Sequence, residues 1–279
     1  MTSAETELTA NVVAPSDEAT DLYGGSGVGL AGPVASRLVE HARLRPGWRV
    51  LDAGCGAGAV LIRAARAVSP GGQVIGVDPA AKMLACAGRE AERAGLGDRI
   101  VLSQADATAP AFGPASFDAI LASLVLHPPT DPAGALARWH ELLVPGGTLA
   151  FPRAVATDPR WFPVMVAVDS YAGAAPAGES SVHRPEPLPA TTAMLDACGY
   201  ADVASVIETV TFRYDSPQQW WDTAASEGPW VTWRHIPARR LAEARAEAMA
   251  LAGELCEPDG SLLRRARMAF LTARRAEGG

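Results

Sequence analysis

The chain has 279 residues, of which 48% are hydrophobic and 20% are charged, and its net charge is −7. These are the values of an ordinary globular protein, which excludes wholesale disorder. The acidic balance argues against a nucleic-acid partner, which would require a cationic surface. No apolar run approaches the roughly 20 residues of a membrane-spanning helix, and residues 1–21 lack the basic and apolar regions of a secretory signal.

The four cysteines are far apart in the sequence and form no Cys-x-x-Cys pair. They are Cys55, Cys86, Cys198 and Cys256. This spacing indicates neither a zinc site nor a disulfide framework, and it is consistent with a reducing compartment. We therefore expect a cytoplasmic protein without a bound metal.

From residue 33 onward, short apolar runs alternate with helical patterns of hydrophobic residues. Helices are predicted over residues 33–44, 59–68, 80–94 and 133–143, and strands over residues 48–51, 73–77, 99–103, 117–122 and 148–151. Strands that are separated by helices form a parallel sheet with helices on both of its faces. The first half of the chain therefore predicts an α/β core.

The second half has a different composition. Residues 155–190 are rich in proline and alanine, and a strand pattern follows over 201–214, a helix pattern over 237–256 and a last strand pattern over 268–272. The core is thus interrupted twice, and insertions of this length usually form a cap over an active site. The expected division is a mobile N-terminal segment (1–30), a core (31–154), a cap insertion (155–192), a continuation of the core (193–214), a second cap insertion (215–262) and a final core strand with the tail (263–279).

The sharpest motif is the sequence VLDAGCGAG at residues 50–58, where a predicted strand turns into a helix. Gly54, Gly56 and Gly58 let the backbone pass close to a ligand and direct its N–H groups toward it. A glycine-rich turn alone is weak evidence, because Gly54, Gly56 and Ala59 also satisfy the looser fingerprint of dinucleotide-binding proteins.

The position of the acidic residues makes the glycine turn informative. Asp52, Asp78 and Asp106 stand at the ends of the first three predicted strands, and Ser123 follows the fourth. Ligands of open parallel sheets bind at the carboxyl ends of strands, so these residues should converge on one crevice. There Asp78 could accept both hydroxyls of a ribose, and Asp106 the amino group of an adenine. An acidic crevice suits a cationic ligand and repels pyrophosphate, which favours S-adenosylmethionine over NAD.

Five blocks in chain order resemble the class I S-adenosylmethionine-dependent methyltransferases. They are VLDAGCGAG, VIGVD, QADA, FDAILASLVLH and LLVPGGTLAF. The similarity is to the small-molecule branch with a ubiquinone-methylase-like core, and it spans residues 46 to about 155. The resemblance implies a Rossmann-like, doubly wound, mostly parallel seven-stranded sheet, here with a helical cap formed by the insertions.

The resemblance also implies which residues contact the cofactor, S-adenosylmethionine. Asp52, Gly54 and Gly56 would hold its methionine part, Asp78 its ribose, and Asp106 and Ala107 its adenine, with Ser123 near the sulfonium and Pro79 and Met83 completing the set. Members of the family often cover the cofactor with an aromatic residue, for which Tyr23 is the candidate; alternatively, Tyr23 packs the N-terminal segment onto the core. Many members have two histidines after the fourth strand, where this chain has His127-Pro128.

Methyl transfer from a sulfonium depends more on alignment than on a base. Positioning the two reactants supplies about 7–11 kcal/mol of the barrier, whereas a general base contributes about 10²–10⁴-fold in rate. The candidate bases are His127 at the mouth of the crevice and His183 and Glu179 in the first insertion. Each of the three could instead have a purely structural role.

The region after the fifth predicted strand indicates where an acceptor would bind. Arg153 directly follows that strand, and the tryptophans Trp161, Trp220, Trp221 and Trp230 offer area for a flat or greasy molecule. The alternative is that the indoles only pack the cap against the core. We therefore expect a methyltransferase that acts on oxygen or carbon of a small hydrophobic metabolite of specialised metabolism.

Three other functions are compatible with the same residues. The fold and cofactor could serve a non-methylating cyclisation or other rearrangement, the glycine turn could belong to an NAD-dependent oxidoreductase, or the crevice could bind its ligand without turnover. The partner that we expect is a small hydrophobic or aromatic substrate, with neither nucleic acid nor a membrane, and a homo-oligomer is possible.

Overall fold

The computed structural model describes residues 7–11, 31–126, 131–172, 187–226 and 236–277. The chain divides into two compact units. The core unit consists of Ala31–Arg153, Glu186–Ile207 and Met268–Gly279, and the helical unit of Met1–Leu30, Ala154–Pro185 and Glu208–Arg267. None of the helices in the described ranges is long and apolar enough to cross a membrane.

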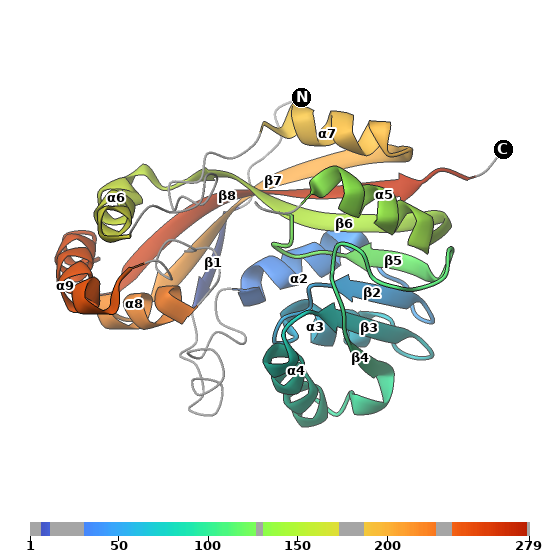
Figure 1. Cartoon of the computed structure of the whole chain (residues 1–279), viewed down its shortest axis with the longest axis horizontal. Coiled ribbons are helices and arrows are strands. Elements are labelled where there is room, and N and C mark those ends of the chain that lie inside the picture. The colour runs from blue at the N-terminus through green and yellow to red at the C-terminus, as the bar shows by residue number, and fades with distance from the viewer. Residues whose placement is uncertain (1–6, 12–30, 127–130, 173–186, 227–235, 278–279) are drawn as a thin grey trace. The chain divides into compact units, whose positions relative to one another are not determined.

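A mostly parallel sheet forms the centre of the core unit (Figure 1). Seven of its strands are β2 (Arg49–Ala53), β3 (Gln73–Asp78), β4 (Ile100–Gln104), β5 (Phe117–Leu121), β6 (Leu143–Thr157), β7 (Tyr200–Tyr214) and β8 (Leu262–Arg275), in the order β7-β8-β6-β5-β2-β3-β4. A short eighth strand, β1 (Glu7–Asn11), is added beside β7. β2 pairs in parallel with β3 and β5, β3 with β4, and β5 with β6. Val50, Leu51 and Ala53 are fully buried, as expected for a parallel strand covered on both faces. The predicted seven-stranded Rossmann-like sheet is confirmed.

Local sequence explains several helix ends in the core unit. Its helices are α2 (Ala31–Ala42), α3 (Ala59–Ala67), α4 (Ala81–Arg93), α5 (Pro132–Leu142) and α7 (Leu188–Ala197), with a short 3-10 helix, η1, at Gly97–Arg99. α5 begins after Asp131, whose Oδ1 accepts the Gly134 N–H at 3.1 Å, and Pro132 occupies the first helical position. α4 ends just before Gly95, whose left-handed backbone (φ +67°) is typical of helix ends. α3 packs on β2 and β3, and α4 on β3 and β4.

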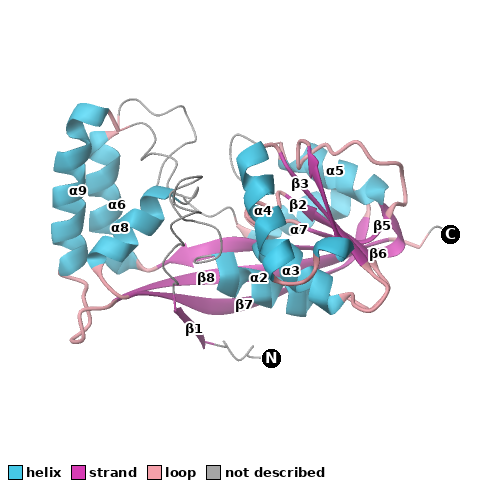
Figure 2. Ribbon diagram, turned by 90° about the horizontal axis from the view of Figure 1, so that it is seen from below, coloured by secondary structure: helices cyan, strands magenta, loops and turns pink. Residues whose placement is uncertain are grey.

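The helical unit has its own aromatic core. It contains β1 (Glu7–Asn11), η2 (Pro159–Trp161), α6 (Phe162–Tyr171), α8 (Pro217–Ser226) and α9 (Ala238–Gly253). β1 pairs in parallel with β7, from Glu7 opposite Thr209 onward, and α9 packs against both α6 and α8 (Figure 2). Trp161 and Trp220 are fully buried, with their ring centroids 5.1 Å apart.

Three strands are shared between the two units. β6, β7 and β8 each continue from residues of one unit into residues of the other. The sequence predicted only residues 148–151 of β6 and 268–272 of β8, because the apolar pattern breaks at Pro152 in one strand and at the arginines of LLRRAR in the other. Helix α6 was not predicted within the proline- and alanine-rich segment.

Candidate active site

A glycine turn connects β2 to α3 at the carboxyl end of the parallel strands. Gly54, Gly56 and Gly58 all have left-handed backbones, with φ of +74°, +51° and +97°. The Gly54 N–H donates to the Val77 carbonyl at 2.8 Å, which ties the turn to the end of β3. A Cβ at Gly54 would lie 2.5 Å from Val125 Cγ2, so both the backbone and the packing require glycine there.

Asp52 is the fourth residue of β2 and is buried, with 1% of its surface exposed. Neither of its carboxylate oxygens has a hydrogen-bond partner among the described residues. Burial and the nearby negative charge of Asp78 raise its pKa to about 8. Because a buried carboxylate without a partner is costly, Asp52 is suited to a cationic ligand that would neutralise its charge.

Asp78 is the last residue of β3, and two backbone amides fix its carboxylate. Oδ2 accepts the Gly56 N–H at 3.0 Å, and Oδ1 accepts the Ala80 N–H at 2.9 Å. An ionised carboxylate offers about four lone-pair positions, so each oxygen keeps acceptor capacity for a ligand. Two oxygens held in this way match a pair of neighbouring hydroxyls. The carbonyl of the next residue, Pro79, accepts Gln104 Nε2 at 3.0 Å.

Asp106 follows β4 and organises a tight turn. Its Oδ1 accepts the hydroxyl of Thr108 at 2.7 Å and the N–H of Thr108 at 2.8 Å, and these hydrogen bonds lower the pKa of Asp106. The adjacent Ala107 is buried, and its carbonyl accepts Trp139 Nε1 at 2.9 Å. Asp106 and Ala107 are therefore held in a fixed backbone conformation beyond the strand.

The strand register brings the predicted residues to one edge of the sheet. Asp52 pairs with Gly76 on β3 and with Leu121 on β5, and Asp78 pairs with Gln104 on β4. The structure thus places the predicted cofactor set at or just beyond the carboxyl ends of β2, β3, β4 and β5. That set is Asp52, Gly54, Gly56, Asp78, Pro79, Met83, Asp106, Ala107 and Ser123.

Sequence reasoning missed three residues that support this edge. Val125 packs against the glycine turn, Gln104 holds the Pro79 carbonyl, and Thr108 holds Asp106. The Asp-x-Thr spacing at residues 106–108 is a turn signal that could have identified Thr108. The contacts of Val125 and Gln104 depend on the pairing of strands, and no local sequence pattern predicts them.

The structure describes only some of the other residues that the sequence predicts for the site. Tyr23, His127, Glu179, His183 and Trp230 lie outside the described residues. Arg153 is half-buried in β6, and Trp161, Trp220 and Trp221 lie in the helical unit with 0%, 0% and 6% of their surface exposed. The burial of these indoles favours the packing role that the sequence had left open for them.

The sheet order, the glycine turn and the acids at the strand ends define a Rossmann-like nucleotide-binding fold of the methyltransferase type. A methyltransferase-domain family model matches residues 50–147. Nocamycin O-methyltransferase of Saccharothrix syringae is 32% identical over 244 residues, which cover 83% of this chain and 87% of the relative. Aklanonic acid methyltransferase DauC of Streptomyces sp. (strain C5) is 40% identical over 135 residues, 48% of this chain and 61% of that protein.

A solved structure shows the same fold over the whole length. The [4+2]-cyclase SpnF aligns with 96% of this chain and 100% of its own, with a TM-score of 0.60 and 22% sequence identity. The chain belongs to the class I S-adenosylmethionine-dependent methyltransferases, in their small-molecule branch.

S-adenosylmethionine is therefore the cofactor, and the residues present fit its groups. The unpartnered carboxylate of Asp52 suits an ammonium group, and the two fixed oxygens of Asp78 suit the diol of a ribose. NAD would instead bring a pyrophosphate close to two carboxylates, which is electrostatically unfavourable. The NAD-dependent oxidoreductase considered from the sequence is set aside.

Proposed function

We propose that the protein methylates an oxygen atom of a small hydrophobic metabolite of specialised metabolism. The observation that carries this proposal is the similarity to nocamycin O-methyltransferase, which extends over 83% of the chain and so well beyond the methyltransferase domain at residues 50–147. Similarity confined to that domain would support only the cofactor. Similarity that includes the remaining segments supports a related acceptor chemistry as well.

The residues at the strand ends are assigned to the cofactor by their chemistry. Asp52 and the glycine turn would hold the methionine part, the Asp78 carboxylate the ribose, and the turn at Asp106 and Ala107 the adenine. When bound, S-adenosylmethionine supplies a methyl group on a positively charged sulfur. The remaining assigned contacts are Tyr23, Pro79, Met83 and Ser123.

The protein's own residues must orient the acceptor and remove its proton. We assign His127 as the base whose imidazole takes the hydroxyl proton while the new oxygen–carbon bond forms, with His183 and Glu179 as the alternatives. A base of this kind contributes about 3–5 kcal/mol, and alignment contributes about 7–11 kcal/mol. Most of the expected acceleration therefore comes from positioning.

The acceptor is assigned to residues outside the methyltransferase domain. Arg153 is the candidate for orienting a carbonyl or acidic group of the acceptor, and Trp230 is the candidate for apolar contact with it. Trp161, Trp220 and Trp221 are buried, so we assign them to packing within the helical unit rather than to contact with the acceptor.

The test is a turnover assay with S-adenosylmethionine labelled with ¹³C in its methyl group. The purified full chain is incubated with aromatic and polyketide-type acceptors that carry phenolic, enolic or carboxylic hydroxyls. We expect S-adenosylhomocysteine to form in step with a product that is heavier by one labelled methyl in place of a hydrogen. The ¹³C chemical shift of that methyl then distinguishes attachment to oxygen from attachment to carbon.

Other outcomes of this assay have defined meanings. A labelled methyl on carbon would refute oxygen as the accepting atom and leave the methyltransferase activity intact. A product of unchanged mass, formed without S-adenosylhomocysteine, would indicate a cyclisation or other rearrangement, the alternative considered from the sequence. Binding of the cofactor with no turnover of any acceptor would indicate a binding module.

A further inference from the structure

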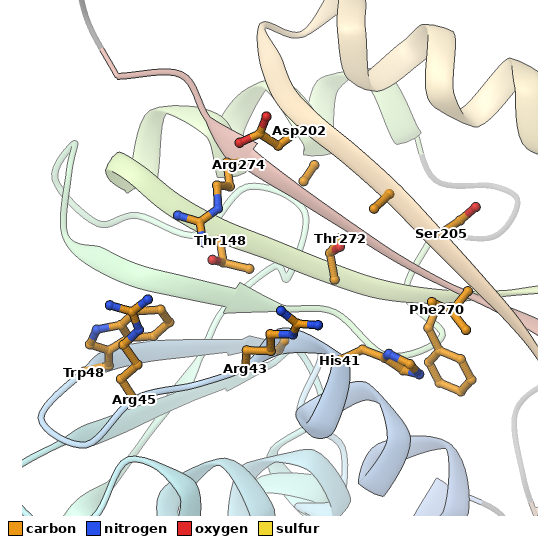
Figure 3. Close-up of a pocket in the computed structure, with 14 residues that line it drawn as sticks. His41, Arg43, Arg45, Trp48, Thr148, Asp202, Ser205, Phe270, Thr272 and Arg274 are labelled. Carbon is orange, nitrogen blue, oxygen red and sulfur yellow. The ribbon is translucent and has the colours of Figure 1, made fainter.

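The core unit contains a pocket at the opposite end of β2 from the glycine turn (Figure 3). Its volume is about 370 Å³. The end of α2 and the loop before β2 form one wall, and β6, β8 and the beginning of β7 form the rest. Because residues 41–48 precede β2 and residues 54–58 follow it, this pocket is separate from the cofactor site.

The pocket has a positive charge in a protein whose net charge is −7. Three arginines line it, Arg43, Arg45 and Arg274, against a single carboxylate, that of Asp202. Figure 3 shows Arg43 and Arg45 on the segment before β2 and Arg274 on β8, with Asp202 on the side of Arg274. Anions are therefore attracted to this cavity.

The guanidinium groups of these arginines make few ion pairs or hydrogen bonds with the described residues. Five other arginines in the described ranges form ion pairs with carboxylates, whereas Arg43, Arg45 and Arg274 form none there. Arg274 donates one hydrogen bond, to the Gly146 carbonyl at 3.3 Å, and Arg45 lies over the Trp48 ring at 5.6 Å from its centroid. A guanidinium has five N–H donors in a planar fork that matches carboxylate and phosphate oxygens.

The backbone conformations of two residues that line the pocket also indicate a functional site. Arg43 has φ +49° and Asp202 has φ +52°, two of the four left-handed residues other than glycine in the described part of the chain. Arg43 directly follows the end of α2, a position that glycine fills most easily. An arginine is thus kept where its own backbone conformation is unfavourable, and such positions concentrate at functional sites.

The other residues that line the pocket include aromatic rings and side chains with hydroxyl groups. The His41 ring stacks on Phe270, with centroids 5.1 Å apart and an interplanar angle of 29°, and the Trp48 indole is half-buried at the pocket. Thr148 and Thr272 add hydroxyl groups. Flat apolar surfaces next to guanidinium groups favour a ligand that has a planar apolar body and an anionic group.

We propose that this pocket binds a small organic anion, in which a carboxylate or a phosphate monoester is attached to a flat apolar group. The volume lies within the range of small-molecule sites, roughly 300–1,000 Å³. The arginines engage the anionic group, and Trp48 and the His41 ring, which is backed by the buried Phe270, contact the apolar body. The site is distinct from the one at which methyl transfer takes place.

The test is calorimetric titration of the full chain at low ionic strength, saturated with S-adenosylhomocysteine so that the cofactor site is blocked. The probes are phenyl phosphate, 2-naphthoate, the uncharged 2-naphthamide and inorganic phosphate. We expect phenyl phosphate, 2-naphthoate or both to bind saturably and to weaken as salt is added, and we expect 2-naphthamide not to bind. The anion that binds identifies the preferred group as phosphate or carboxylate.

Substitutions of the arginines test whether the organic anion binds in this pocket. Arg43→Gln and Arg274→Gln should each weaken binding by about tenfold or more. Arg43→Gly should do the same while the protein unfolds at an equal or higher temperature, because glycine suits the left-handed backbone. Arg239→Gln is the matched control, since Arg239 is an exposed residue of α9 in the helical unit, and it should leave binding unchanged.

Several results would overturn the proposal. They are no saturable binding of either organic anion, binding of inorganic phosphate as tight as that of phenyl phosphate, or an equal loss of affinity in Arg239→Gln and Arg43→Gln. Binding only when S-adenosylhomocysteine is left out would assign the anion to the cofactor site and would also refute the proposal.

Discussion

The carboxylates of Asp52 and Asp78 differ in their hydrogen bonds although they act on each other electrostatically. Asp78 accepts the amides of Gly56 and Ala80, whereas Asp52 has no partner among the described residues, and the charge of Asp78 adds to burial in raising the Asp52 pKa to about 8. A proton and a ligand ammonium group are therefore alternative ways of neutralising Asp52. This relationship makes the stability of the ligand-free protein sensitive to pH.

Asp52→Asn should stabilise the ligand-free protein relative to wild type at both pH 6 and pH 9, and about twice as much at pH 9 as at pH 6. The Asp52 pKa is about 8 in the folded protein and 3.8 as a free carboxyl. Between these values the folded state holds a proton that the unfolded state lacks. In the wild type, the contribution of this proton to the free energy of unfolding is therefore complete below about pH 4. It is lost as the pH rises to 8, by up to about 1.4 kcal/mol per pH unit.

Urea unfolding of both proteins at pH 6 and pH 9 checks this prediction. Asp98→Asn, in the exposed η1 segment, serves as the control and should show the same small difference from wild type at both pH values. An Asp52→Asn difference that is equal at pH 6 and pH 9 would show that the pKa of Asp52 in the folded protein is not raised above about 6.

Asp78→Ala should weaken the binding of S-adenosylhomocysteine about tenfold or more. The substitution removes hydrogen bonds to a charged group, worth about 1.5–3 kcal/mol each, and it also frees the Gly56 amide that Asp78 holds. Calorimetric titration measures the affinity. Undiminished binding would contradict the assignment of Asp78 to the ribose.

Gly54→Ala should destabilise the protein by about 2 kcal/mol or more, because a Cβ in a left-handed backbone would also lie 2.5 Å from Val125 Cγ2. Gly95→Ala is the matched control: Gly95 is left-handed too, but a Cβ there meets no atom within 4 Å, so only the backbone cost of about 1 kcal/mol remains. Chemical denaturation compares the two. Adding Val125→Ala to Gly54→Ala should recover part of the loss, and no recovery would refute the steric explanation.

His127→Ala should lower the turnover number more than the affinity for the cofactor. Loss of a general base reduces the rate about 10²–10⁴-fold, whereas binding of S-adenosylhomocysteine should change little. His140→Ala is a suitable control, because the His140 ring contacts the Gly199 carbonyl at 3.2 Å and has a structural role in α5. A His127→Ala enzyme that turns over at the wild-type rate would exclude His127 as the base.

The core sheet was largely predictable from sequence because β2, β3 and β5 are short and buried, and β2 to β5 are bounded by glycine and polar residues. The acids of the candidate site were predictable for the same reason, since Asp52 and Asp78 stand at the ends of clear apolar runs. The far halves of β6 and β8 were not, because only part of each strand is buried and arginines interrupt the apolar pattern.

The pocket lined by Arg43, Arg45 and Arg274 could not be predicted from the sequence, for a different reason. Its residues come from four separate segments, around positions 41–48, 148, 202–206 and 270–274, and only Thr148 lies in a recognised block, LLVPGGTLAF, which does not indicate a pocket. Only the pairing of β6, β7 and β8 places them around one cavity. Arg43 even follows a helix end where glycine would be expected, and no pattern in the sequence indicates that its backbone is left-handed.

The continuity of β6, β7 and β8 through both units limits how this enzyme can be recombined with its relatives. A chimaera that exchanges the whole helical unit must join the two parents in the middle of hydrogen-bonded strands, where a shift of one residue would turn every following side chain to the opposite face. Exchange of the segments between those strands, such as residues 158–187 or 215–261, avoids such junctions. Recombination with relatives should therefore proceed by grafting these segments into an unaltered sheet.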